Sequence, residues 1–253
     1  MKDLTKTKIK DLVENVIEAK LNKYSAETDY KPFFEALFGE AVIIQTSILH
    51  SFYTSFGMSV YEPIAKILAE NAGYEAQTQY DLLGEIDSQT ENMINELCHS
   101  NAPPNKVREI EKIREFIKQG KSKKDKDSRV DIFIYKPNTD EELYIDITTA
   151  KPNKKEFGAL RRKMLRWCGL RFSQHRKAKI KTYIAIPYNP YHPHSYARWT
   201  ANECDVQNEL LIQENFWNEC AGEGVYEDLL NIFREVGVEM KSKIDQWIKS
   251  KSK

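Results

Sequence analysis

The sequence predicts an α/β fold, with a mixed central sheet flanked by helices and with helical additions on its N- and C-terminal sides. Two observations lead to this prediction. Residues 130–186 follow the order strand, strand, helix, strand, and a helix between two strands of one sheet indicates a parallel crossover. The stretches on both sides repeat apolar residues at helical spacing. The length of 253 residues suits a single large domain, 1–253.

The N-terminal part, 1–73, is expected to be helical. Its first helix follows from an apolar stripe at helical spacing, made of Leu12, Val13, Val16, Ile17 and Leu21. A second apolar run covers 33–56, and the stretch "SVYEPIAKILAENAG" predicts a third helix that ends at Gly73.

The predicted α/β core covers 76–190. It opens with a short strand within 76–86, and helices at 88–98 and 105–119 form an insertion around the loop "NAPPN". The charged connector "QGKSKKDKDSR" is expected to be mobile. Two strands, "RVDIFIY" and "LYIDITTA", then flank the turn "KPNTDE". A helix over 155–172 and a buried strand, "KTYIAIP", complete the core.

The C-terminal part, 191–253, is predicted to be a loop followed by helices near 205–217, 224–236 and 238–250. No run of about 18 apolar residues occurs, so neither a membrane span nor a signal peptide is expected. The cysteines are widely spaced, which favours free thiols in a reducing cytoplasm. They are Cys98, Cys168, Cys204 and Cys220.

Two aspartates are expected to face each other across the predicted hairpin. If Asn138 and Thr139 form the centre of a tight turn, Asp131 lies directly opposite Asp146. Alternation then gives the hairpin one apolar face and one face with both acids. An exposed acidic pair in water is one interpretation. The other is a site for a divalent cation such as Mg²⁺, because a cation converts the repulsion between the carboxylates into coordination.

The net charge is zero, but the charges are unevenly distributed. Between Lys151 and Lys181, twelve Lys and Arg residues accompany a single acid, Glu156, whereas 201–240 carries ten acids and one Arg. Such a run is usually a solvated surface. Here it directly follows the strand that carries Asp146, and positive charge beside a site is what binding of a polyanion requires.

The hairpin "VDIFIYKPNTDEELYIDITTAKPN" resembles the PD-(D/E)xK nuclease signature, in which an acid opens one strand and acid-x-Lys ends the next. The segments "TAKPNKKEF", "LRRKMLRW", "HSFYTSFGMSVYEPIA" and "FWNECAGEGVYEDLLNIFREVG" are similar to type II restriction endonucleases of the TdeIII-like group. The likeness covers roughly residues 32–248. It implies a restriction-endonuclease-like core and Mg²⁺-dependent, sequence-specific hydrolysis of double-stranded DNA.

The sequence departs from that signature at one position. Thr148 stands where the resemblance leads one to expect lysine, and a threonine hydroxyl cannot supply positive charge to the transition state. Either Lys151 has taken over the role, or a helix lysine such as Lys163 has done so, or the site is catalytically weak. The rival functions are therefore a non-cleaving DNA-binding protein on a nuclease fold and a repair or phage nuclease without sequence specificity.

The resemblance also implies a metal site and its partners. The expected ligands are Asp131, Asp146, the carbonyl of Ile147, and Glu62, which also suits the start of a helix as a plain dipole partner. Asn153 is a candidate for DNA contact or a helix N-cap. The other DNA candidates are Lys154, Lys155, Arg161, Arg162, Gln174, His175 and Arg198. A palindromic target implies a homodimer, with a DNA methyltransferase as functional partner and a cytoplasmic location.

Overall fold

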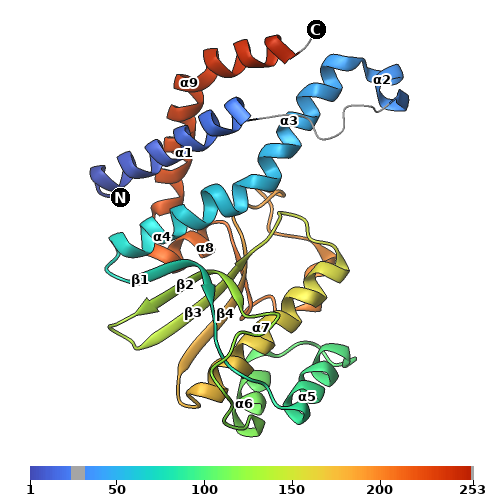
Figure 1. Ribbon diagram of the computed structural model, residues 1–253, viewed down its shortest axis with the longest axis vertical. Helices are drawn as coiled ribbons and strands as arrows, with labels where there is room; N and C mark the ends of the chain where they lie inside the picture. Colours follow the sequence, from blue (N-terminus) through green and yellow to red (C-terminus); the bar gives the residue numbers. More distant parts are fainter. Residues whose placement is uncertain (24–31, 252–253) are drawn as a thin grey trace. The chain divides into compact units, whose positions relative to one another are not determined.

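The computed structural model describes residues 1–23 and 32–251. They form two compact units, one made of Met1–Ile67 with Gly224–Lys253 and the other of Leu68–Glu223. The second unit contains a five-stranded mixed sheet with helices packed against it (Figure 1). This confirms the predicted α/β class.

The sheet has the strand order β1-β2-β3-β4-β5. Its first three strands are antiparallel neighbours, β4 runs parallel to β3, and β5 runs parallel to β4. A parallel pair needs a long crossover, and α7 (Lys154–Gln174) provides it between β3 and β4. The strands are β1 (Glu75–Asp81), β2 (Arg129–Lys136), β3 (Glu141–Ile147), β4 (Lys179–Ile186) and β5 (Leu210–Ile212).

The β2–β3 hairpin has the expected register, since Ile132 pairs with Ile145 and Phe133 with Tyr144. Side chains alternate between the two faces of a strand, so this pairing sorts the hairpin into an aliphatic face and a mixed face. The aliphatic side chains are fully buried; they are Val130, Ile132, Ile134, Leu143 and Ile145. The mixed face carries Phe133, Tyr144 and the two aspartates.

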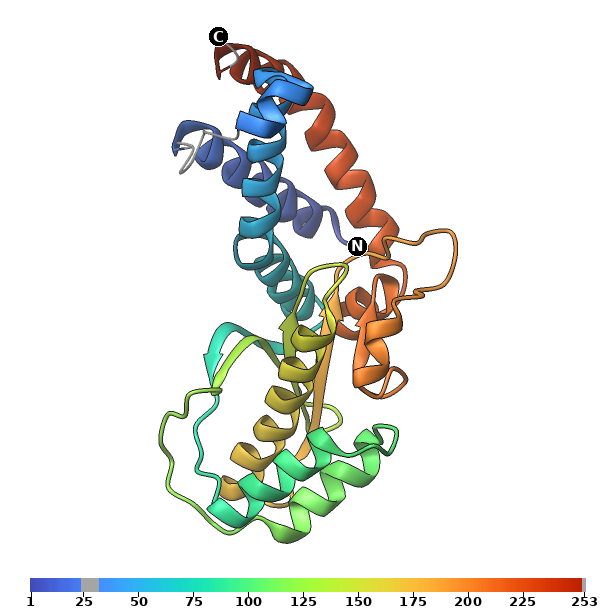
Figure 2. The ribbon, with the colours of Figure 1, turned by 90° about the vertical axis from the view of Figure 1, so that its right-hand side faces the viewer.

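Helix α7 packs through aromatic contacts on the mixed face of the hairpin. Trp167 and Phe157 of this helix are 0% exposed, and Trp167 lies 6.4 Å from Tyr144 of β3 between ring centroids. Burying a side chain of this size contributes about 2–3 kcal/mol. Helices α5 (Ser88–His99) and α6 (Lys106–Phe116) lie against α7 in turn, as Figures 1 and 2 show.

Side-chain caps determine where α5 and α6 begin. Asp87 accepts hydrogen bonds from the backbone N–H groups of Gln89 (3.1 Å) and Thr90 (3.2 Å) at the start of α5. Asn105 accepts one from the N–H of Arg108 (3.0 Å) at the start of α6. Such caps satisfy N–H groups that have no partner within the helix. The prolines of "NAPPN" separate the two helices as expected.

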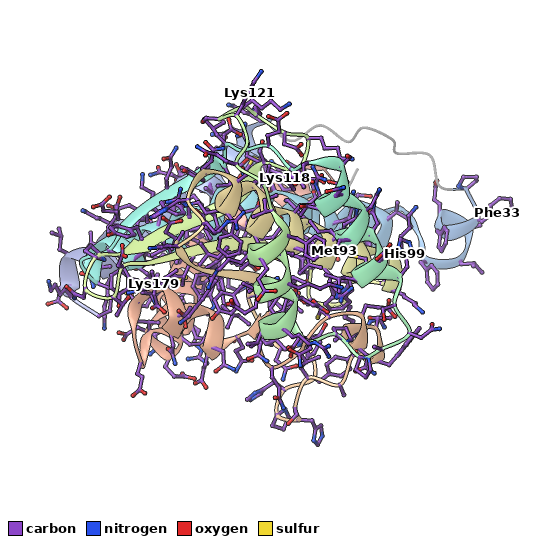
Figure 3. The ribbon with its side chains drawn as sticks, turned by 90° about the horizontal axis from the view of Figure 1, so that it is seen from below. Phe33, Met93, His99, Lys118, Lys121 and Lys179 are labelled. Carbon is purple, nitrogen blue, oxygen red and sulfur yellow. The ribbon has the colours of Figure 1, made fainter. Side chains whose placement is uncertain are left out.

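The connector before β2 contacts neighbouring elements at several points, and its expected mobility stays a prediction. The Lys121 N–H donates to Glu85 (3.0 Å), and the ammonium of Lys124 pairs with Asp81 of β1 (3.0 Å). Lys118, at the start of this segment, donates to Gln89 of α5 (3.0 Å); Figure 3 labels both Lys118 and Lys121. Two lysines of the connector, Lys123 and Lys124, therefore pair with acids that lie before α5 in the chain, Glu85 and Asp81.

The region after β4 differs from the prediction in two places. The helix expected near 205–217 is instead strand β5 followed by α8 (Glu214–Ala221), because the run 210–212 pairs with β4. A short apolar run does not distinguish strand from helix by its periodicity. The helices expected at 224–236 and 238–250 are one helix, α9 (Val225–Lys251), which continues through Gly237.

The first unit is helical, as predicted. It contains α1 (Asp3–Lys23), α2 (Pro32–Phe38), α3 (Glu40–Phe56), a π-helical turn (Gly57–Tyr61), the start of α4 (Glu62–Asn71), and α9. Helix α1 packs on α9, and ion pairs join Lys6 to Asp228 (2.9 Å) and Lys10 to Glu239 (2.6 Å).

Within the described residues, no helix is sufficiently long and apolar to cross a membrane, and the four cysteines are free thiols.

Candidate active site

Asp131 and Asp146 lie opposite each other on the mixed face of the hairpin. Ile132 of β2 pairs with Ile145 of β3. Asp131 precedes Ile132 and Asp146 follows Ile145, so the antiparallel register brings the two aspartates opposite each other. Asp146 is only 6% exposed and Asp131 is half-buried. The two aspartates are therefore not an acidic pair exposed to water. Solvent screens the repulsion between their carboxylates poorly.

Burial raises the pKa of both aspartates, and the charge of Asp146 raises that of Asp131 further. Desolvation, followed by the charge of Asp146, raises the pKa of Asp131 to about 6. Desolvation also raises the pKa of Asp146, whereas the ammonium of Lys163 acts in the opposite direction. The N–H of Ile147 donates to Asp131 Oδ2 (2.8 Å) and favours the ionised form. A cation placed between the two carboxylates would relieve the repulsion.

Lys163 of α7 brings a positive charge to this pair. Its ammonium group donates to Asp146 Oδ2 and also lies 5.1 Å from the centroid of the Trp167 ring. Contact with an aromatic face stabilises a cation and limits the rotamers of the long side chain. The Lys163 side chain is 25% exposed, so it is not sealed inside the protein.

The direction of α7 explains why a lysine in the middle of a helix meets the end of a strand. Near the start of β3, Glu142 accepts two hydrogen bonds of 2.6 Å from Arg171, whereas Asp146 near the end of β3 meets Lys163. The helix therefore runs antiparallel to the strand. Glu142 also accepts from the hydroxyl of Tyr144 (2.6 Å), which fixes the strand beneath the helix. This second contact between α7 and β3 has no signal in the sequence.

Thr148 and Lys151 follow Asp146 in the chain, but Lys151 does not point toward it. The Thr148 N–H donates to the carbonyl of Ala185 on β4 (2.9 Å), which extends the sheet by one residue. The ammonium of Lys151 lies 5.5 Å from the centroid of the Tyr191 ring. Of the two lysines considered as replacements, the structure places Lys163 at the carboxylate pair.

The oxygen atoms at the pair fit a small divalent cation. Asp131 and Asp146 each have one carboxylate oxygen already engaged, with the Ile147 N–H and with Lys163 respectively, which leaves a second oxygen on each. Mg²⁺ takes oxygen ligands and retains several waters, so two carboxylates and one carbonyl suffice. The described part of the chain contains no cluster of three or more His, Cys, Asp or Glu side chains that could hold a metal. Glu62, 3% exposed, is the first residue of α4 and belongs to the first unit.

A family model described as "Type II restriction endonuclease, HinfI" matches residues 1–237. This chain belongs to the HinfI family of type II restriction endonucleases. Its finer placement in the TdeIII-like group remains an expectation. No solved structure matches the chain.

Individual relatives resemble the chain over most of its length. It is 25% identical to the type II restriction enzyme HgiCII of Herpetosiphon aurantiacus, over 95% of this chain and 96% of that protein. It is 24% identical to HgiBI of the same organism, over 96% and 97% respectively. The type II restriction enzyme MjaII of Methanocaldococcus jannaschii is 24% identical over 78% of this chain and 56% of its own length.

Two of the arginines that were expected to contact DNA instead bind side chains of neighbouring helices in this restriction endonuclease. Arg161 pairs with Glu109 of α6 (2.6 Å), with both side chains less than 10% exposed. Arg162 donates to Asn95 (3.0 Å) and also pairs with Glu91 of α5. The prediction assumed that this side of α7 faces solvent, but α5 and α6 cover it. These arginines therefore connect helices, and their placement does not support contact with phosphates.

The N-terminal end of α7 carries the basic residues that remain accessible. Asn153 forms a capping box with Glu156, because its side chain accepts from the Glu156 N–H (3.0 Å) and the Glu156 carboxylate accepts from the Asn153 N–H (2.6 Å). This supports the N-cap interpretation of Asn153. Lys155 is exposed, and Lys154, 64% exposed, forms a surface pair with Glu203 (3.2 Å).

Gln174 and His175 lie at the opposite end of the same helix. They are eleven or more residues beyond Lys163, which corresponds to about 16 Å along the helix axis. Gln174 donates to the carbonyl of Gly120 in the connector (3.0 Å), and His175 terminates the helix. Both therefore lie near the start of β3 rather than at the carboxylate pair.

A loop rich in aromatic and basic residues is attached to the turn that follows β3. The Tyr196 hydroxyl donates to the carbonyl of Ala150 (3.2 Å). Arg198 Nε (3.2 Å) and the Thr200 hydroxyl (2.8 Å) both donate to the carbonyl of Pro152. Trp199, which starts the 3-10 helix η2 (Trp199–Glu203), is 67% exposed. The loop thus presents an open indole ring between two residues that are hydrogen-bonded to the turn after β3.

Proposed function

We propose that the protein is a Mg²⁺-dependent restriction endonuclease that hydrolyses phosphodiester bonds of double-stranded DNA at a specific sequence. The observation that carries this proposal is the buried pair of Asp131 and Asp146 with the ammonium of Lys163 beside it. Membership of the HinfI family and the relatives named as type II restriction enzymes support the same activity.

In this proposal the two aspartates hold the cation, together with the carbonyl of Ile147. A bound Mg²⁺ lowers the pKa of a water molecule and neutralises charge on the phosphate. The raised pKa of Asp131 supports this role, because a carboxylate whose charge is poorly solvated gains more from a nearby cation.

Lys163 supplies the positive charge that Thr148 cannot. Its ammonium is held by Asp146 and the Trp167 ring, so little side-chain freedom is lost when a phosphate approaches. A fixed charge directed at developing negative charge is a large contribution to catalysis. Lys151 keeps the competing role proposed from the sequence, but it would have to leave the Tyr191 ring to reach Asp146.

The surface next to the strand end is the proposed DNA-binding region. Lys151, Lys155 and Arg198 provide positive charge for phosphates, and the exposed Trp199 ring provides a stacking or wedge group. Lys154 contributes once its weak surface pair with Glu203 opens. A homodimer would match the two-fold symmetry of a palindromic site, and a methyltransferase would protect the same site in the host.

The deciding experiment is digestion of a sequenced plasmid by the purified protein with Mg²⁺, with EDTA and an Asp146→Asn variant as controls. Discrete fragments that depend on Mg²⁺ and on Asp146 are the expected result. A smear of fragments would instead indicate a nuclease without sequence specificity. Retarded but uncut DNA would indicate the non-cleaving binding protein that Thr148 raises as the alternative.

A further inference from the structure

Helix α2 has a composition and exposure that an isolated helix in water does not sustain. Four of its seven residues are large and apolar, and none of the seven is buried. Isolated helices shorter than about 12 residues are marginal in water, and packing normally stabilises them. Figure 3 labels Phe33, whose side chain projects outward from this helix. The exposed fractions are 83% for Phe33, 57% for Phe34, 74% for Leu37 and 59% for Phe38.

Helix α3 continues the same kind of surface. Val42, Leu49 and Tyr53 are 47%, 54% and 61% exposed, and their spacing of seven and four residues places them on one side of the helix. An amphipathic helix normally directs such a stripe toward a core. Here the stripe faces outward. These three residues and the four of α2 are called the apolar face below.

The apolar face lies in a stretch that is almost free of charge. Residues 32–61 contain two acids, Glu35 and Glu40, and no Lys or Arg, although 30% of the whole chain is charged. The centres of protein–protein interfaces are depleted of charge in the same way. Binding of nucleic acid or of an anionic membrane surface requires Lys and Arg, which this stretch lacks.

The size of the apolar face matches one side of an ordinary protein interface. Aromatic side chains bury about 150–250 Å² each. With the exposed fractions above, the seven side chains offer roughly 700–900 Å², close to the ~800 Å² that each partner contributes to a standard interface.

We propose that a second copy of this chain docks on the apolar face and that the protein is a dimer through α2 and α3. The seven side chains of the apolar face are all uncharged, so an identical face complements them by apolar contact and without opposite charges. The choice of a second copy rests also on the proposed function. Each chain presents one Asp131–Asp146 pair, whereas a duplex has two strands to cut.

The test measures the oligomeric state of the full-length protein by sedimentation equilibrium, without DNA or Mg²⁺. The test variant is Leu37→Glu/Val42→Glu. The matched control is Leu4→Glu/Val238→Glu, which changes the same residue types at exposed positions on α1 and α9 (Leu4 70% and Val238 77% exposed). The expected result is a dimer for the wild type and the control, and a dissociation constant raised at least 100-fold for the test variant.

A second test variant with milder substitutions, Leu49→Gln/Tyr53→Gln, keeps the test decisive if the first variant misfolds. Circular dichroism verifies that both variants retain wild-type helix content. A monomeric wild type at tens of micromolar would overturn the proposal, and so would folded test variants that remain dimeric. Asp146→Asn separates this proposal from the proposed function, because it should abolish cleavage and leave the dimer intact. Cleavage by Asp146→Asn would overturn the proposed function and leave the dimer surface standing.

Discussion

Lys163 reaches Asp146 from a helix, although the resemblance leads one to expect a lysine on the strand itself. Threonine at position 148 leaves the strand without a cation, and the ammonium from α7 occupies the neighbourhood of the same carboxylate. The position of a charge carried by a helix depends on how the helix crosses the sheet. Its contribution can therefore be tested by moving the charge back to the strand.

Lys163→Ala should lower the single-turnover cleavage rate by about 100-fold or more, the scale of losing one charge-stabilising group. Binding of DNA in Ca²⁺ should change little. Lys151→Ala, which removes the other candidate ammonium, is the matched control, and it should retain most of the rate. Adding Thr148→Lys to the Lys163→Ala variant should restore part of the lost rate. A fully active Lys163→Ala enzyme would contradict this assignment.

The raised pKa of Asp131 predicts how stability varies with pH in metal-free buffer. Asp131 holds its proton up to about pH 6 in the folded state and up to about pH 4 in the unfolded state. The folded protein thus binds more protons between these values, and the free energy of unfolding falls as pH rises from about 4 to 6. The size of the fall is on the order of 1–3 kcal/mol.

Urea denaturation in EDTA across this range measures that effect. Asp131→Asn should flatten the decline between pH 4 and 6, because the amide does not titrate. Asp11→Asn, at an exposed carboxylate on α1, is the control and should leave the decline unchanged. Equal profiles for Asp131→Asn and the wild type would show that the pair is better solvated than its burial indicates.

The carboxylate pair could be predicted from the sequence, whereas the lysine that lies beside it could not. Alternation and a tight turn determine which residues of a hairpin face each other, so Asp131 and Asp146 follow from local rules. Lys163 entered only as one of two possible lysines. Its proximity to Asp146 depends on the antiparallel course of α7 across β3, which is a tertiary feature without a local signal.

At the scale of elements, the capping box at Asn153 connects the site to the stability of α7. Asn153→Ala should lower the free energy of unfolding by about 1 kcal/mol, since the first turn of the helix loses its side-chain acceptor. Asn153→Asp is the control and should preserve stability, because aspartate caps equally well. Urea denaturation at pH 8 measures both. A loss in cleavage without a loss in stability for Asn153→Ala would instead favour the DNA-contact interpretation.

The elements that sequence reasoning missed are determined by their context rather than by the preferences of their own residues. Strand β5 has only three residues, and pairing with Ile184 and its neighbours in β4, rather than intrinsic preference, makes it a strand. Helix α9 continues through Gly237 because the cost of a mid-helix glycine, about 1 kcal/mol, is offset along a helix of 27 residues. The longer elements with clear periodicity, such as α7 and the hairpin, were found near their predicted bounds.

At the scale of the whole molecule, zero net charge does not prevent strong electrostatic binding. The cations beside the site act locally, and acids elsewhere in the chain are screened within about 10 Å at 0.1 M salt. The sequence indicated a basic block after β3. It could not show that Arg161 and Arg162 are engaged by acids on α5 and α6.

Raising the salt concentration from about 50 to 200 mM should weaken DNA binding steeply, as expected when several counterions are released per site. Neutralising Lys151, Lys155 and Arg198 together should reduce the slope of log K against log salt by about 2–3. Arg161→Met/Arg162→Met is the contrasting variant: it should destabilise the fold and leave the slope nearly unchanged. Fluorescence anisotropy with a labelled duplex in Ca²⁺ gives the slopes. Equal slopes for wild type and the triple variant would assign DNA binding to another surface.

The separation of seventeen residues between Asp146 and Lys163 has a consequence for how this gene can change. A codon lost from the first half of α7 would rotate Lys163 by about 100° around the helix axis and carry its ammonium away from the carboxylate. Loss of three or four codons together returns Lys163 to nearly the same side of the helix and shifts it along the axis by only about one turn. Insertions and deletions that survive in this interval should therefore come in steps of whole helical turns, a periodicity that aligned descendants of this gene would display.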